Sequence, residues 1–389
     1  MMTEDVLELD DATTTDPARF VEWAAALGAE IAVHARPHDL EGSFVDESYE
    51  VLRTRGYLAL AVPTELGGYG ASIAQVAMAQ RELARHCAAT ALASAMHHHI
   101  VLFTAWRYRR GLPGAEATLR RVADEAIVLV STGGADYTTP RGTAVAVDGG
   151  YRVSGRKVFA SQVPAGDVFS TMFAFDDPEQ GQRVLNMAVP VKAEGVRIIE
   201  TWDTMGMRGT GSHDVEFTDV FVPADKVLAN RPYGVLDPPL QVISSIAFPV
   251  ISAVYLGVAE AAQDHAVTAI AATDKVHDVS IQRMVGLMEH KLRTCAWALD
   301  GALTVVGDDP APSAETVAAV MSAKRTIAIE GVEVCDLAME VAGGSSFFRT
   351  SPIEQCYRDV RGAKFHPLAP EQTLLYAARV KLGLPADTI

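Results

Sequence analysis

Cysteine and positive charge are both scarce in this sequence. The 389 residues include only four cysteines, none in a Cys-x-x-Cys pair, and 33 Lys and Arg against 49 Asp and Glu, for a net charge of -16. The cysteine spacing argues against a disulfide framework or a zinc site and fits a reducing cytoplasm, where we expect the protein. The acidic balance argues against nucleic acid or an anionic membrane surface as a partner.

Long apolar runs are missing as well. No segment reaches the ~18 uninterrupted apolar residues of a membrane-spanning helix. The acidic start MMTEDVLELDD has no signal-peptide core. We therefore expect no membrane contact. Hydrophobic residues still make up 49% of the chain, which is enough for two or three domains with cores of their own.

The spacing of apolar residues changes twice along the chain and predicts three domains. Ala-rich helical periodicity fills residues 1–125, apart from the loop VPTELGGYG. Period-two alternation, as in GTAVAVDGGYRVSGRKVFAS, covers residues 126–232, and helical periodicity returns over residues 233–389. The predicted fold class is α+β, with an N-terminal helical domain, a middle β-barrel-like domain and a C-terminal four-helix bundle.

A glycine-rich turn followed directly by a strand is the most distinctive local pattern. Residues 202–228 read WDTMGMRGTGSHDVEFTDVFVPADKVL, with apolar and polar residues alternating after the last glycine. Glycines and small residues let backbone N–H groups approach a ligand closely. Taken alone, this pattern predicts only a tight turn and a half-buried strand.

Five blocks of sequence, in this order, resemble the acyl-CoA dehydrogenase superfamily of flavoproteins. They are VPTELGGYGAS, YRVSGRKVFASQVPAGDVF, MGMRGTGSHDVEFTDVFVPADKVL, FPVISAVYLGVAEAAQDHA and AGGSSFFRTSPIEQCYRDVRGAKF. The resemblance spans nearly the whole chain and implies the family's fold. It implies a flavin between the β domain and the C-terminal helices, expected as FAD with FMN possible. It also implies a homodimer or homotetramer in which a neighbouring subunit completes each flavin site.

The resemblance also assigns cofactor contacts. The predicted contacts all lie in turns or at a strand end: Phe159, Ala160, Ser161, Gly134, Asp136, Gly343 and Gly344. Phe159 stands where many members have Trp, and Gly343 and Gly344 match a loop that meets the neighbouring subunit's flavin. A flavin needs an apolar slot with hydrogen-bond donors at its polar edge, and these residue types suit that need.

The chain departs from the family at the catalytic base. A classical member removes the α-proton of an acyl thioester with a Glu, which must be close and desolvated. The resemblance places that Glu at Pro367, or at Ala247 in a minority of members, and neither residue is a carboxylate. The family's Arg near the thioester falls on Phe248. The Arg that reaches a flavin phosphate is also missing, with Arg283 the nearest candidate.

Four details instead resemble the flavin monooxygenases built on the same fold. They are Pro140–Ala144 before Asp148–Tyr151, Phe-x-Ser at 159–161, Gly-Thr-Gly-Ser at 209–212, and a His seven residues after Asp359, which is His366. An imidazole with a pKa near neutrality can donate a proton to bound oxygen or take one from a substrate. Against this reading, Lys157 replaces a usual Trp.

Three activities therefore stay open. The full-length resemblance favours α,β-dehydrogenation of an acyl thioester, with His366 as an atypical base and an electron-transfer flavoprotein as partner. The alternatives are a two-component monooxygenase supplied by a flavin reductase, with His366 in its active site, and a non-catalytic subunit of a hetero-oligomeric dehydrogenase. We expect the substrate pocket near His97, Phe248 and Arg208. We expect no metal, because the consecutive histidines at 97–99 lack the i, i+4 spacing of a metal site.

Overall fold

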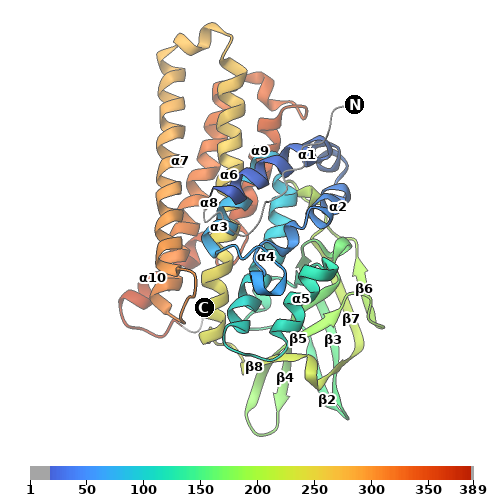
Figure 1. Cartoon of the computed structure of the whole chain (residues 1–389). Coiled ribbons are helices and arrows are strands. Elements are labelled where there is room, and N and C mark those ends of the chain that lie inside the picture. The colour runs from blue at the N-terminus through green and yellow to red at the C-terminus, as the bar shows by residue number, and fades with distance from the viewer. Residues whose placement is uncertain (1–17, 387–389) are drawn as a thin grey trace.

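The computed structural model describes residues 18–386. Along the chain, a first set of helices is followed by a sheet and then by a second set of helices (Figure 1). The N-terminal helices are α1 (Arg19–Glu41), α2 (Asp46–Thr54), α3 (Ile73–His86), α4 (Ala88–Tyr108) and α5 (Ala115–Glu125). The C-terminal helices are α6 (Pro238–Ile270), α7 (Val279–Val306), α8 (Ala314–Ala342), α9 (Pro352–Val360) and α10 (Pro370–Lys381). The predicted order of helical, strand and helical parts is confirmed.

The middle domain is an open mixed sheet. Its strands are β1 (Leu129–Ser131), β2 (Thr143–Val147), β3 (Gly150–Ala160), β4 (Val168–Asp177), β5 (Gly181–Pro190), β6 (Val196–Ile199), β7 (His213–Pro223) and β8 (Val227–Pro232). They pair in the order β6-β7-β3-β2-β4-β5-β8, with β1 added parallel to β4. The barrel-like prediction is wrong, because edge strands β6 and β8 do not pair with each other. Alternating apolar and polar residues indicate that each strand buries one face, but they do not indicate whether the sheet closes into a barrel.

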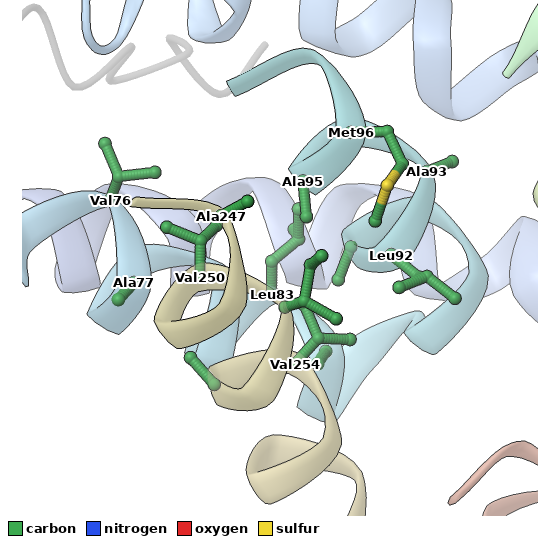
Figure 2. Close-up of a cluster of buried hydrophobic side chains, with 14 of the residues drawn as sticks. Val76, Ala77, Leu83, Leu92, Ala93, Ala95, Met96, Ala247, Val250 and Val254 are labelled. Atoms are coloured by element: carbon green, nitrogen blue, oxygen red, sulfur yellow. The ribbon is translucent and has the colours of Figure 1, made fainter. Parts of the chain in front are cut away.

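Helices α3, α4 and α6 share one core that links the N-terminal and C-terminal parts. Figure 2 shows Val76 and Leu83 of α3, Leu92 of α4, and Val254 of α6 meeting there. Helix α4 also packs against β1, so it connects the bundle to the sheet. Close contact depends on small residues: a Cβ added at Gly257 of α6 would lie 2.1 Å from the Arg81 carbonyl oxygen of α3.

Helix α6 is the most apolar helix of the described residues. It is 33 residues long and apolar enough to cross a membrane by length and composition, although no uninterrupted apolar run had been found. In the folded chain, 94% of its most apolar window is buried inside the protein. A helix that is apolar on all sides must be buried, and α3, α4, α7, α8 and α9 pack around α6.

Candidate active site

A buried ion pair fixes the turn where the sequence predicts cofactor contacts. Lys157 of β3 donates to the Asp136 carboxylate at 2.7 Å and to the Arg141 and Met172 carbonyl oxygens. Burial lowers the pKa of Lys157, and the Asp136 charge opposes that shift. The Asp136 carboxylate is therefore paired with a lysine inside the β domain. Its contribution to the site is to hold the short 3-10 turn Gly134–Asp136 against the end of β3.

The end of β3 presents an aromatic ring to the outside. Phe159 has a φ of 58° and is 58% exposed as a residue, with its ring 5.9 Å from that of Trp202 in an edge-on arrangement. Nearby, the Ser161 hydroxyl hydrogen-bonds to Ser212 at 2.8 Å, and Ser212 to Thr210 at 2.7 Å. An exposed apolar ring beside hydroxyl groups suits a flat ligand with one polar edge.

A first cavity of about 70 Å³ opens between the β domain and the C-terminal helices. Gly134 and Tyr137 line it on the β side, Phe248 and Met321 on the helical side, and Pro367 closes it from the loop after α9. A Cβ added at Gly134 would lie 3.2 Å from Pro367 Cγ, so glycine keeps this gap open. Phe159 does not line this cavity, so its role as a flavin contact stays a prediction.

His366 lies beside this wall, next to Pro367. Its Nε2 is 2.8 Å from the Tyr255 hydroxyl of α6. Burial of the ring, and then the charge of Lys324, lower the pKa of His366 to about 3. Lys324 of α8 is itself buried and donates to the Leu368 carbonyl oxygen at 2.7 Å. His366 is therefore a neutral imidazole at neutral pH.

A second cavity of about 210 Å³ lies between α4, the sheet and the start of α6. Its wall is mostly aromatic and aliphatic, and includes His99, Phe103, Trp106, Phe169, Met172 and Leu240. Tyr137 lines both cavities, so the two spaces adjoin at this side chain. Burial lowers the pKa of His99 to about 4, which leaves this ring neutral as well.

The structure brings together only some of the predicted site residues. Gly134 and Phe248 line the first cavity, and Asp136 and Ser161 sit in the adjoining turns. Gly343 lies at the far end of α8 from the cavity residue Met321, about 30 Å along the helix at 1.5 Å per residue. A contact from Gly343 and Gly344 to a neighbouring subunit's flavin stays a prediction.

Two predicted pocket residues have structural partners. His97 is fully buried, with Nε2 2.9 Å from the Leu58 carbonyl oxygen and Nδ1 accepting from Leu129 N–H at 3.1 Å. Arg208 donates to the Asp39 carbonyl oxygen at 2.7 Å and pairs with Asp203 at 3.1 Å. Neither residue lines either cavity. Substrate contact by these two residues stays a prediction.

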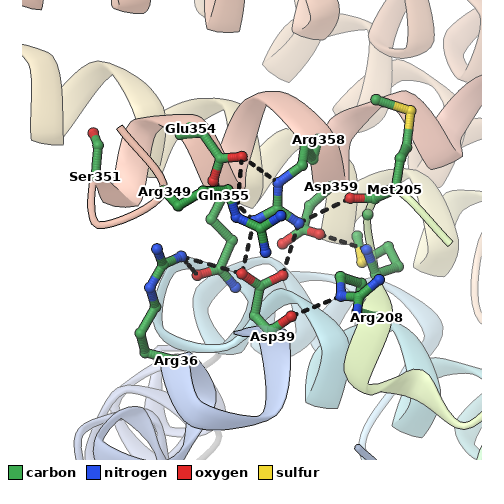
Figure 3. Close-up of polar contacts among 12 residues, drawn as sticks. Arg36, Asp39, Met205, Arg208, Arg349, Ser351, Glu354, Gln355, Arg358 and Asp359 are labelled. Atoms are coloured by element: carbon green, nitrogen blue, oxygen red, sulfur yellow. Dashed lines mark hydrogen bonds and ion pairs between the residues drawn. The ribbon is translucent and has the colours of Figure 1, made fainter. Parts of the chain in front are cut away.

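The Arg-Asp motif that carried part of the resemblance holds the domains together. Figure 3 shows Arg358 facing Asp39 of α1 and Glu354 of its own helix. The guanidinium donates to both Asp39 oxygens, at 2.8 and 2.7 Å, a bidentate geometry. Asp359 accepts from the Met207 backbone N–H, and burial raises its pKa to about 7. This network joins the first helix, the glycine-rich turn and α9.

Sequence reasoning missed Tyr255, Lys324 and the Lys157–Asp136 pair. Tyr255 is 111 residues from His366 and sits in an apolar helix whose pattern marks no face. Lys157 could have drawn attention, because a lysine inside a predicted core strand needs a buried counter-charge. Nothing in the sequence alone identifies Asp136 as that partner.

The fold and this site define a flavin-dependent oxidoreductase. Sequence profiles of the acyl-CoA dehydrogenase N-terminal, middle and C-terminal domains match residues 20–108, 131–220 and 249–370. YdbM of Bacillus subtilis (strain 168), an acyl-CoA dehydrogenase by name, is 30% identical over 89% of this chain and 93% of its own. The chain belongs to the acyl-CoA dehydrogenase family.

Two further relatives bear on the reaction. Amino sugar nitrososynthase DnmZ of Streptomyces peucetius is 30% identical, over 91% of this chain and 90% of its own. The structure of KijD3, in complex with FMN and a dTDP-linked 3-amino sugar, superposes with a TM-score of 0.88 and 27% identity, covering 98% of this chain and 97% of KijD3. These two relatives do not support acyl-thioester dehydrogenation, which the sequence favoured.

Proposed function

We propose that this protein is the oxygenase component of a two-component flavin-dependent monooxygenase that oxidises the nitrogen of a small amine. A separate reductase would supply the reduced flavin. Reduced flavin supplies the two electrons that oxygen activation needs. One oxygen atom goes to the substrate nitrogen and the other leaves as water. The names of DnmZ and of the amino sugar bound to KijD3 support nitrogen as the reacting atom.

The observation that carries this proposal is the pair His366 and Tyr255 where a dehydrogenase needs a carboxylate. Thioester dehydrogenation requires a strong base beside the α-carbon. Pro367 and Ala247 occupy the two family base positions, and the adjacent imidazole has its pKa lowered to about 3. So weakly basic a ring is poorly suited to removing a carbon-bound proton. It is well suited to orienting a polar group by hydrogen bonding.

The cavities indicate the size and character of the substrate. The second cavity, at about 210 Å³, is smaller than the roughly 300–1,000 Å³ typical of sites for drug-sized ligands. Its wall is largely apolar and includes two arginines: Arg231 pairs with Asp237 at 3.2 Å, and Arg107 donates to the Pro113 carbonyl oxygen. We therefore propose a compact, largely apolar amine rather than a nucleotide-linked sugar. We propose FMN as the bound flavin, because the family's phosphate-binding Arg is missing.

The test supplies the purified protein with FMN, an unrelated NADH-dependent flavin reductase and ¹⁸O₂, together with a panel of aliphatic, aromatic and nucleotide-linked amines. Mass spectrometry of the products should show one ¹⁸O on the nitrogen of a small amine. The His366→Gln variant should lower product formation by about 100-fold or more, the usual scale for losing one positioned hydrogen-bond donor. His290→Gln, on the exposed face of α7, is the matched control and should retain activity.

A second measurement tests the competing activity. The flavin-loaded protein is titrated without oxygen against a panel of acyl thioesters, and flavin absorbance is followed. Bleaching by a thioester, with no label on any amine, would establish the dehydrogenase and overturn the proposal. Isothermal titration with FMN and FAD tests the cofactor: tighter binding of FAD would overturn the choice of FMN.

A further inference from the structure

The contact between Tyr255 and His366 joins two groups that both hold no charge at neutral pH. Tyr255 is 2% exposed, and burial raises the pKa of its hydroxyl well above the usual value. Burial and the Lys324 charge lower the pKa of His366. The hydrogen bond of 2.8 Å between the Tyr255 hydroxyl and Nε2 is therefore one between a phenol and a neutral imidazole. A neutral imidazole carries its hydrogen on one nitrogen only.

The surroundings of the hydroxyl decide which group donates. Within the described residues, His366 Nε2 is the only hydrogen-bond partner that the Tyr255 hydroxyl has. If Nε2 carried the hydrogen, the buried phenol proton would have no acceptor, which costs about 1–3 kcal/mol. If the phenol donates, its buried proton has an acceptor, and the imidazole hydrogen lies on Nδ1, which is not a buried unpartnered atom. The phenol therefore donates to Nε2.

We infer that Tyr255 is a positioning residue that holds His366 in the tautomer with hydrogen on Nδ1, so that the ring offers a donor and not a base to an incoming group. Nδ1 has no hydrogen-bond partner among the described residues, and it is not one of their buried unpartnered atoms. It is therefore open to an incoming group. The functional consequence, though not the tautomer itself, rests on the proposed function.

The charged groups around the ring support the same state. Lys324 of α8, His99 of α4 and Tyr255 of α6 are the titratable groups that act on His366. The Leu368 carbonyl oxygen fixes the Lys324 ammonium at 2.7 Å, and no carboxylate contributes to the His366 shift. Asp359 acts on Tyr255 but not on His366, and a nearby cation disfavours imidazolium. The donor on Nδ1 is therefore a neutral ring hydrogen, and Tyr255 determines its position.

The experiment reads the tautomer directly. The purified full-length protein is labelled with ¹⁵N-histidine, and long-range ¹H–¹⁵N correlation spectra are recorded with and without FMN. The His366 signals are assigned by their loss in His366→Gln. In the wild type, we expect Nδ1 protonated and Nε2 unprotonated. In Tyr255→Phe, the form with hydrogen on Nε2 should gain population several-fold, because Nε2 no longer accepts a hydrogen bond from the phenol.

Tyr376→Phe is the matched control. Tyr376 is also fully buried in the C-terminal helices, but its hydroxyl donates to the Ala314 carbonyl oxygen at 3.4 Å, so the His366 signals should stay unchanged. A wild-type ring protonated on Nε2 overturns the inference, and this result does not depend on whether Tyr255→Phe folds. If Tyr255→Phe does fold, an unchanged His366 tautomer in this variant also overturns it. A wild type with hydrogen on Nδ1 but no ¹⁸O in any amine refutes the proposed function and leaves the tautomer assignment standing.

Discussion

At the scale of single residues, two adjacent histidines of α4 have opposite hydrogen-bonding states. Both nitrogens of His98 are buried without a partner, while its ring packs edge-on against Tyr57 at 5.2 Å. A neutral imidazole always has one donor and one acceptor to satisfy. We predict that His98→Phe raises the free energy of unfolding by about 1 kcal/mol or more, because it removes unsatisfied polar atoms and keeps the aromatic packing. Urea unfolding at neutral pH measures this change.

His97→Phe is the matched control for that prediction. His97 is just as buried, but its nitrogens satisfy the Leu58 carbonyl oxygen and the Leu129 N–H. Its replacement leaves both backbone groups unpaired in the core and should lower the free energy of unfolding by about 1–3 kcal/mol. If both variants change stability in the same direction, hydrogen-bond satisfaction does not distinguish the two histidines.

At the scale of elements, the contact between α3 and α6 depends on a single glycine. A Cβ at Gly257 would lie 2.1 Å from the Arg81 carbonyl oxygen and 3.1 Å from Ala84 Cβ, so the helices would have to separate. We predict that Gly257→Ala lowers the free energy of unfolding by about 1–3 kcal/mol, the usual range for overpacking. Chemical denaturation measures the loss.

Gly301 of α7 provides the comparison, because a Cβ there would meet nothing within 4 Å. Gly301→Ala should stabilise by about 0.5–1 kcal/mol through helix propensity alone. Gains of similar size at both positions would show that the two helices are not in close contact at Gly257.

The same scale shows what the sequence could and could not predict about the elements. Helical periodicity identified the helical regions on both sides of the sheet, because an amphipathic or Ala-rich pattern is a local property. The open sheet was not predictable, since closure depends on whether β6 meets β8 and their sequences do not record that contact. The tight packing of α6 was also hidden, because Gly257 shows its role only beside Arg81.

At the scale of the whole molecule, short motifs led to one part of the candidate site and not to the residues that support it. The Gly134 turn, Phe159 and the region of His366 were proposed as site residues because short motifs carry them. Tyr255, Lys324 and Lys157 were not, because each acts through a partner from another element: His366, Leu368 and Asp136. Such pairs arise when distant segments pack, and one sequence does not specify which segments meet.

Buried histidines also determine how the whole fold responds to acid. Burial lowers the pKa of His97 and His99 to about 4 and that of His366 to about 3, and it lowers the pKa of His98 well below the usual value. In the unfolded chain these rings titrate near ~6.5. Their contribution to stability is therefore complete above that pH and is lost as the pH falls toward the folded values.

Asp359 acts in the opposite direction. Burial raises its pKa to about 7, so its stabilising contribution is present at low pH and is lost as the pH rises through that value.

The four buried histidines outnumber the single carboxylate Asp359, so below about pH 6.5 the unfolded chain binds more protons than the folded one. We predict that the free energy of unfolding falls on acidification by about 1.4 kcal/mol per pH unit for each excess proton. Urea unfolding from about pH 7 to about pH 5 measures the slope. His98→Phe should reduce the number of protons taken up on unfolding by up to one. A free energy of unfolding that stays level or rises as the pH falls would contradict the lowered pKa values of the buried histidines.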